Sequence, residues 1–217
     1  MIDFDPGPPH TVCVGLMVQE LIMVADDFDG FISDYYARFA EALLAFDKDP
    51  LKDILAVFDA VIAAGGTVWV AGNGGSASIS DHTVCDSSKG THVEGQPPFR
   101  TISLTSNVAM LTALGNDISY DDVFSEQLKY YLKPEDAVLL VSSSGNSPNV
   151  VKACEYANAA GVPTLAFVGF KGGKLKDAAK HCIHIEVENY GIVEDTHQSL
   201  IHAMTQYMKA RSLAKAG

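Results

Sequence analysis

Two carboxylates and two histidines are spaced in this sequence as proton transfer or metal binding would require. His82 and Asp86 are four residues apart, which places both side chains on one face of a helix. Glu194 and His202 lie about two turns apart on a later expected helix, roughly 80° apart around its axis. Imidazole nitrogens and carboxylate oxygens are compatible zinc ligands, and the same groups can exchange protons with a substrate.

A glycine-rich segment lies between an apolar run and the helix that carries His82. Gly72-Asn-Gly-Gly-Ser76 follows Val68-Trp-Val70, so it ends a predicted strand and begins a predicted helix. Free backbone N–H groups and the positive end of the helix dipole favour an anion at such a position. The spacing matches neither dinucleotide nor P-loop motifs, so no nucleotide is expected. Taken alone, the segment is equally compatible with a structural turn.

A second polar loop strengthens the case for phosphate. Ser142-Ser-Ser-Gly-Asn-Ser147 follows the apolar run 137–141, and Pro148 is placed to begin the next helix. A helix cap requires one serine, whereas this loop has four. Hydroxyls and backbone amides without any lysine favour a phosphate monoester bound by neutral donors at a helix N-terminus.

The elements that must position these loops alternate between strand and helix. Apolar runs at 68–70, 101–104, 137–141, 163–168 and 182–187 predict five strands, and helical periodicity predicts helices over 31–46, 50–64 and about 194–213. Continuous apolar strands separated by helices are typical of a parallel sheet covered on both faces. The predicted fold class is therefore α/β, a doubly wound parallel five-stranded sheet with N-terminal helices.

Composition excludes several classes of protein. The 217 residues carry 15 basic and 27 acidic side chains, a net charge of −12, which argues against a nucleic-acid partner. The apolar piece 12–24 is interrupted by Gln19 and Glu20 and follows acids and prolines, so neither a signal peptide nor a membrane span is expected. Four widely separated cysteines favour reduced thiols and a cytoplasmic protein. Residues 1–30 are interpreted as an extension of uncertain order.

The ordered set of motifs resembles the sugar-isomerase (SIS) domain, and specifically the sedoheptulose-7-phosphate isomerases, also called phosphoheptose isomerases. The resemblance runs from about Phe31 to Met208, within a domain taken as 31–217. It rests on Gly72-Asn-Gly-Gly-Ser-Ala77, His82, Gly115-Asn-Asp-x-x-Tyr-x-x-x-Phe124, the serine loop followed by Pro148-Asn-Val150, and the terminal helix with Glu194, His197 and His202.

This resemblance implies a flavodoxin-like sheet, N-terminal helices packed between subunits, and a homotetramer with active sites at subunit interfaces. It also implies that zinc is bound by His82, Asp86, Glu194 and His202. The residues that would bind the phosphosugar are Asn73, Gly74, Gly75, Ser76, Asp86, Asn107, Ser142, Ser143, Ser144, Ser147 and Glu194.

The implied reaction interconverts an aldose phosphate and a ketose phosphate by moving a proton between C1 and C2 through an enediol. By the resemblance, Asp86 is the base and His202 its partner, and the product is a heptose phosphate for surface polysaccharide. Three positions depart from the family pattern. Asp86 stands where the isomerases carry Glu, Glu194 where they carry Gln, and Asn107 where an acid is common. The shorter carboxylate of Asp86 bears directly on rate, since a misplacement of about 1 Å can cost a hundredfold.

Other interpretations are compatible with the same residues. The enzyme could act on a different sugar phosphate, or the chain could be a non-catalytic relative that senses phosphosugars or binds a replication-initiation protein. The set His82, Asp86, Glu194 and His202 favours an enzyme. His197 is expected to face solvent or a subunit interface, and Cys85 is expected to be a small buried residue rather than a nucleophile.

Overall fold

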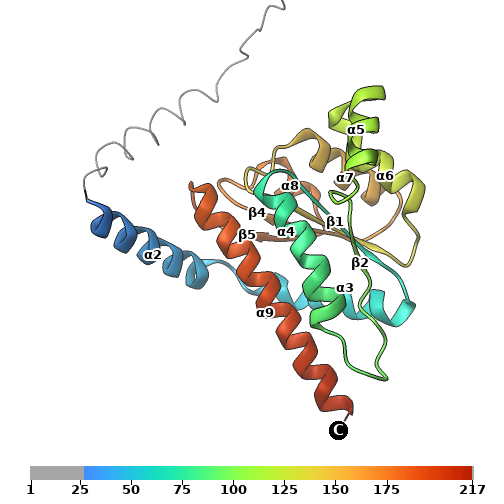
Figure 1. Cartoon of the computed structure of the whole chain (residues 1–217), viewed down its shortest axis with the longest axis horizontal. Helices are drawn as coiled ribbons and strands as arrows, with labels where there is room; N and C mark the ends of the chain where they lie inside the picture. Colours follow the sequence, from blue (N-terminus) through green and yellow to red (C-terminus); the bar gives the residue numbers. More distant parts are fainter. Residues whose placement is uncertain (1–26, 217) are drawn as a thin grey trace, which may run out of the picture. The chain divides into compact units, whose positions relative to one another are not determined.

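The computed structural model describes residues 27–216 (Figure 1). Its helices and strands, in chain order, are α2 (Phe28–Ala45), α3 (Asp49–Ala64), β1 (Val68–Gly72), α4 (Gly75–Val84), the π-helix η1 (Cys85–Gly90), β2 (Thr101–Ser103), α5 (Val108–Asp117), the 3-10 helix η2 (Tyr120–Asp122), α6 (Val123–Tyr131), β3 (Ala137–Ser142), α7 (Pro148–Ala159), β4 (Thr164–Val168), α8 (Gly173–Ala178), β5 (His181–His184) and α9 (Tyr190–Ala216).

The five strands form one parallel sheet in the order β2-β1-β3-β4-β5, which confirms the predicted fold class. The chain winds outward from β1 to β2 in one direction and from β3 to β5 in the other. The loops after β1 and β3 therefore meet at the point where the winding direction changes, which is where ligands of such sheets bind. Gly72, the last residue of β1, pairs with Val141 of β3, so these two loops leave the sheet side by side.

Both faces of the sheet are covered, because successive strand residues point to opposite sides. Trp69, Ala71, Val138 and Leu140 belong to a buried core that also includes residues of α5, α6, α7 and α8. Their neighbours in β1 and β3 are equally buried and point to the opposite face. On that side α4 and α9 lie against each other (Figure 1), and α4 also packs on β1 and β2. Burial on both sides explains why the strands are apolar at consecutive positions rather than at alternate ones.

Several boundaries differ from the sequence prediction. The last helix begins at Tyr190, earlier than the predicted start near 194, and continues to Ala216, while the fifth strand is the short His181–His184 instead of 182–187. The first helix begins at Phe28, and most of the expected extension, residues 1–26, lies outside the described part of the chain.

The chain divides between Glu41 and Ala42 into two compact units, and the second contains the whole sheet. Most of α2 therefore belongs to the first unit. Among the helices of residues 27–216, none combines the length and the apolar character needed to cross a membrane.

Candidate functional site

A cleft of about 260 Å³ opens where the loops after β1 and β3 meet. Its lining residues are Asn73, Gly74, Gly75, Ser76, Ser142, Ser143, Ser144, Ser147, Tyr190 and Glu194. The N-terminal ends of α4 and α7 both contribute to this lining, at Gly75 and Ser147. Free amide groups of two helix N-termini, together with hydroxyls, make the cleft a suitable environment for an anion.

The serine loop is held in shape by a close approach of two backbone segments. Gly145 has a φ of 64°, and a Cβ at this position would collide with the carbonyl oxygen of Gly172. The amide of Leu175 donates to the carbonyl of Gly145 at 2.9 Å, so the α8 region supports the loop from outside. The Ser143 hydroxyl is buried in the lining and has no hydrogen-bond partner within residues 27–216. This hydroxyl is therefore available to a ligand.

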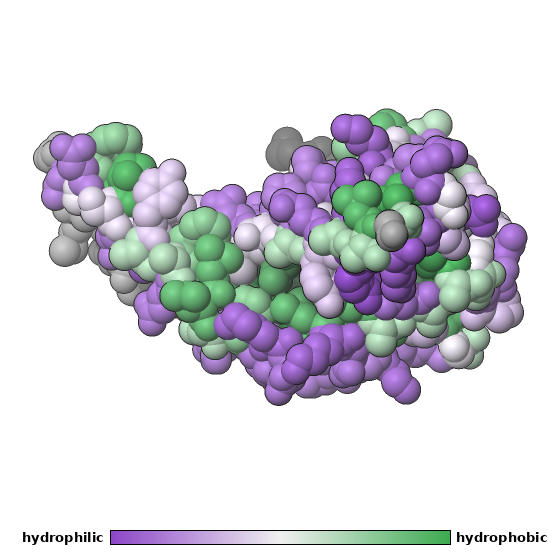
Figure 2. Space-filling view, turned by 90° about the horizontal axis from the view of Figure 1, so that it is seen from below, coloured by the Kyte–Doolittle hydropathy of each residue, from purple (hydrophilic) through white to green (hydrophobic). Residues whose placement is uncertain are grey.

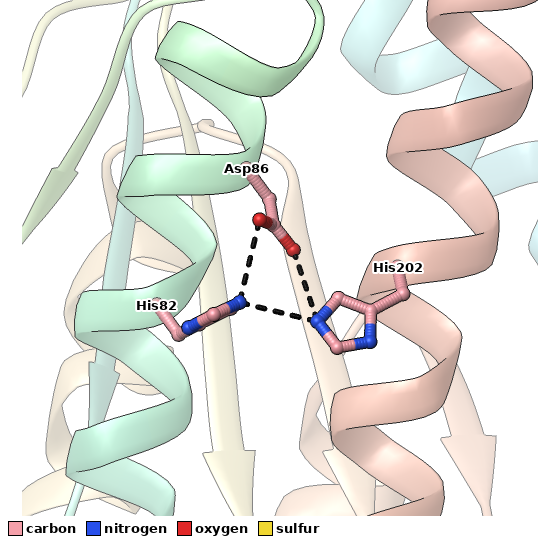
Figure 3. A group of neighbouring side chains, drawn as sticks. All are labelled: His82, Asp86 and His202. Carbon is pink, nitrogen blue, oxygen red and sulfur yellow. Dashed lines mark hydrogen bonds and ion pairs between the residues drawn. The ribbon is translucent and has the colours of Figure 1, made fainter.

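Three side chains, one from each of three helical elements, converge at a second position (Figure 3). His82 projects from α4, Asp86 from η1 and His202 from α9. His82 Nε2 lies 3.3 Å from Asp86 Oδ1, His202 Nε2 lies 3.4 Å from Asp86 Oδ2, and the two Nε2 atoms are 3.1 Å apart. The expected sharing of one face by His82 and Asp86 is observed. The chain passes from α-helix to π-helix between them, a feature concentrated at functional sites.

The donor set of this group fits a divalent metal ion. Asp86 Oδ2 is buried and accepts no hydrogen bond from any described residue, and His202 Nε2 lies 3.4 Å from it. Each of the three residues offers one donor atom, and these atoms all lie within 4.8 Å of one another, which makes them candidate ligands of a single ion. Two imidazoles and a carboxylate with one position left over are typical of catalytic zinc sites.

Gln198 is a neighbour of this group that the sequence reasoning missed. Its Nε2 lies 3.0 Å from His202 Nε2, one turn away on the same helix. The sequence offered one signal for Gln198: it is four residues before His202, and residues four apart on a helix share a face.

Glu194 lies apart from the His82, Asp86 and His202 group and close to the cleft. Its carboxylate occupies the space into which a Cβ of Gly75 would project, so the glycine leaves room for this side chain beside the start of α4. Burial, together with the nearby charge of Asp195, raises the pKa of Glu194. His202 is eight residues after Glu194, a rise of about 12 Å along the helix axis, which separates the two side chains.

The α4 and α9 helices run in the same direction, since Gly75 faces Glu194 near their starts and His82 faces His202 further along. The cleft and the His82, Asp86 and His202 group are therefore two separate sites along the same pair of helices.

Two other expected residues have structural roles. Asn107 caps α5, where its side chain accepts a hydrogen bond from the Met110 amide, and it is not among the residues that line the cleft. His197 is fully buried under β4, with Nε2 3.3 Å from the Val168 carbonyl oxygen, and burial lowers its pKa to about 4. The expectation that His197 faces solvent or an interface is wrong, because it lies on the core side of α9.

Cys85 is exposed, so its expected burial is also wrong. The π-helical turn η1 begins at this residue, directly after the last residue of α4. No signal in the sequence distinguished this turn from a continuous α-helix.

A larger cavity, about 480 Å³, is lined by Lys176, Cys182, His184 and segments 42–50 and 185–187. It contains no residue of the glycine or serine loops. Size alone would favour this cavity, but the convergence of helix N-termini and free donors favours the smaller cleft as the ligand site.

Comparison with known proteins identifies the family. The SIS domain family model matches residues 33–169. A protein of Thermoplasma volcanium named probable phosphoheptose isomerase is 40% identical over 175 residues, covering 79% of this chain and 87% of that protein. The phosphoheptose isomerase of Rhodospirillum rubrum is 33% identical over 154 residues, covering 71% and 81%.

Solved structures share the fold. The phosphoheptose isomerase GmhA from Neisseria gonorrhoeae matches with a TM-score of 0.77 at 24% identity, over 84% of this chain and 98% of that one. A phosphoheptose isomerase from Francisella tularensis matches with a TM-score of 0.76 at 22% identity, over 86% and 98%. From the family model and the curated relatives, the chain belongs to the SIS-domain family and, within it, to the phosphoheptose isomerases.

Proposed function

We infer that this protein is an aldose-ketose isomerase that converts sedoheptulose 7-phosphate to D-glycero-D-manno-heptose 7-phosphate. The observation that carries this inference is the alignment of a phosphate-type cleft and a proton-transfer group along the same two parallel helices. The names of the relatives support the seven-carbon substrate. The domain that performs the reaction is taken as residues 31–217.

The distance between the cleft and the His82, Asp86 and His202 group suits a sugar phosphate of this length. Ser76 and His82 are separated by about 9 Å of helix rise, and Glu194 and His202 by about 12 Å, at roughly 1.5 Å per residue. An open chain of seven carbons contains six carbon–carbon bonds of about 1.5 Å each. With its phosphate in the cleft, such a chain extends its C1 and C2 atoms toward Asp86 and His202.

The residues of the group can carry the proton transfers. Asp86 removes a proton from C1 to give the enediol and returns it at C2, while His202 relays the hydroxyl proton between O1 and O2. Asp86 is suited to this role because its Oδ2 is free of hydrogen bonds within the described chain. The contacts of His82 and His202 with the two carboxylate oxygens fix the orientation of the carboxylate.

A zinc ion is proposed at the same position. His82, Asp86 and His202 would hold it, with Gln198 as a further candidate from α9. The expected ligand Glu194 lies at the cleft instead, about two helical turns from His202. When bound, the ion would polarise the substrate oxygens and stabilise negative charge on them. The fit rests on the buried Asp86 Oδ2, which accepts no hydrogen bond from a described residue, and on the short distances between the donor atoms of the three residues.

A cytoplasmic homotetramer with sites at subunit interfaces is also proposed. Large hydrophobic side chains are exposed on α2 and α9, among them Tyr36, Leu44, Tyr207 and Leu213. Figure 2 shows hydrophobic residues at the surface between hydrophilic ones. Exposed apolar surface of this kind is typical of association between copies of a chain.

Turnover of sedoheptulose 7-phosphate by the purified full chain with added zinc tests the proposal. We expect isomerisation of this substrate. Activity on six-carbon and five-carbon ketose phosphates should be lower by at least tenfold, because their shorter chains do not reach from the cleft to the His82, Asp86 and His202 group. Phosphosugar binding without turnover at several pH values would refute the enzyme and favour a sensor or binding protein. Preferential turnover of a shorter sugar would refute the assigned substrate.

A further inference from the structure

A buried amide joins the two loops that form the cleft. Asn73 follows β1 in the glycine loop, and Asn149 lies in the first turn of α7, directly after the serine loop. Asn73 Nδ2 donates to Asn149 Oδ1 at 2.8 Å, and Asn149 Nδ2 donates back to Asn73 Oδ1 at 3.1 Å. The exposed Tyr120 adds a third bond, from its hydroxyl to Asn73 Oδ1 at 3.0 Å. Asn149 is 1% exposed, so it cannot contact a ligand in the cleft directly.

These bonds determine what Asn73 can offer to a ligand. A side-chain amide has two N–H donors and one oxygen with two acceptor sites. In Asn73 both acceptor sites are used, by Asn149 and Tyr120, and one N–H is used by Asn149. One N–H of Asn73 remains, on a side chain that lines the cleft. Asn73 can therefore only donate to a ligand, and the direction of that donor is fixed by its partners.

We propose that Asn149 is a positioning residue of the cleft. Its paired amide holds the glycine loop and the serine loop at a fixed separation and directs the remaining N–H of Asn73 toward an oxygen of the bound phosphosugar. Tyr120 reinforces the pair from the rim. The proposal rests on the proposed function in that a phosphorylated sugar occupies the cleft.

The position of Asn149 between the two loops explains how the Asn73–Asn149 pair can affect ligand binding. The cleft is formed from two segments 70 residues apart in sequence, and their correct separation determines how many donors one phosphate can contact at once. A hydrogen-bonded pair in a buried position is costly to leave half-made, because the remaining partner stays unsatisfied. Loss of Asn149 therefore acts on the ligand through Asn73 and the glycine loop.

A double-variant cycle tests the proposal. Asn73→Ala, Asn149→Leu and the combined variant are compared for KM, kcat and the Kd of inorganic phosphate measured by calorimetry, with melting temperature as the folding control. We expect Asn149→Leu to raise KM and the phosphate Kd about tenfold, a loss of one buried hydrogen-bonded pair, with a smaller change in kcat. The combined variant should bind no more weakly than Asn73→Ala alone.

Two results would overturn the proposal. One is a multiplication of the two single losses in the combined variant, which would mean that Asn149 does not act through Asn73. The other is an unchanged phosphate Kd in a folded Asn149→Leu protein. If that variant does not fold, Tyr120→Phe provides the test, with an expected two- to fivefold rise in the phosphate Kd, and Tyr130→Phe, also exposed, is the matched control. An unchanged Kd in Tyr120→Phe then refutes the proposal. Since phosphate binding needs no turnover, an inactive parent protein would count against the proposed function and leave this test in place.

Discussion

The cleft and the His82, Asp86 and His202 group are built from different kinds of donor. The cleft is formed by backbone amides and serine hydroxyls at the ends of strands, with Glu194 as the one titratable carboxylate in its lining. The group consists of titratable side chains on the flanks of two helices. Neutral donors bind a phosphate at any pH at which it is an anion, whereas proton transfer requires groups that change protonation. In the proposed function, binding and chemistry are therefore separated along α4 and α9.

The cleft and the His82, Asp86 and His202 group also differ in how the sequence encodes them. Each half of the cleft is a continuous short segment whose glycines and serines mark it in the sequence. The group requires residues 120 positions apart, His82 and His202, to meet across a helix interface. Phosphate affinity should therefore change little when residues of the His82, Asp86 and His202 group are substituted. In the same way, kcat at saturating substrate should change little when residues of the cleft are substituted.

The strongest test of this separation is Asp86→Asn. We expect kcat to fall about a thousandfold, since a positioned base contributes roughly 10²–10⁴ in rate, while the phosphate Kd and the melting temperature stay close to those of the parent. Steady-state kinetics and phosphate calorimetry measure both quantities. Asp177→Asn, an exposed carboxylate on α8, is the control and should retain full activity. Equal losses in kcat and in phosphate affinity would show that the two regions are not separate.

Ser143→Ala tests the cleft from the opposite side. The buried hydroxyl has no described partner, so its removal should leave the free energy of unfolding unchanged or slightly higher. A hydrogen bond to a charged phosphate is worth about 1.5–3 kcal/mol, so KM should rise roughly 10- to 100-fold with little change in kcat. Initial rates and denaturant unfolding report these values. Ser78→Ala, exposed on α4, is the control, and an unaltered KM for Ser143→Ala would contradict the assignment.

Gln198→Ala tests whether Gln198 belongs to the zinc site proposed at the His82, Asp86 and His202 group. The side chain contacts the same nitrogen of His202 that faces Asp86 and His82. We expect the affinity for zinc, measured by competition with a chromophoric chelator, to fall about tenfold, as is usual when a neighbour of a metal ligand is lost. Gln206→Ala provides a matched control, because Gln206 is exposed and lies one turn beyond His202. Equal zinc affinities in the two variants would remove Gln198 from the group.

Glu194→Gln should have the smallest effect, and that effect should depend on pH. The pKa of Glu194 is raised in the folded protein by burial and by Asp195, so folding favours its protonated form. The stability associated with that form is present below the ordinary pKa of 4.5 and is lost as pH rises through the folded value. Glutamine cannot ionise, so the variant should melt slightly higher than the parent at neutral pH and equally at low pH.

Melting curves across the acid to neutral range measure this difference. The same variant should also bind phosphate slightly more tightly at neutral pH, because a negative charge leaves the cleft. A variant that melts lower than the parent at neutral pH would indicate that the carboxylate is stabilising, and would place Glu194 with the charged group rather than with the cleft.

Much of the site could be predicted from sequence because it is local. Apolar runs identified the five strands, and the glycine and serine loops identified both halves of the cleft, since a strand end followed by a helix start is a property of neighbouring residues. The four-residue spacing of His82 and Asp86 was sufficient to place them together. Helix boundaries were less certain by a few residues, because the last turn depends on packing beyond the segment.

The rest was decided by tertiary structure. Sequence spacing put Glu194, His197 and His202 on one helix, but only the packing of α9 on the sheet and on α4 determines that these three side chains meet the cleft, the core and the metal-type group, respectively. Asn149 and Gln198 had no distinguishing motif, since their importance comes from what faces them. A sequence specifies the periodicity of a helix, and the surfaces packed around that helix determine which chemistry each of its faces performs.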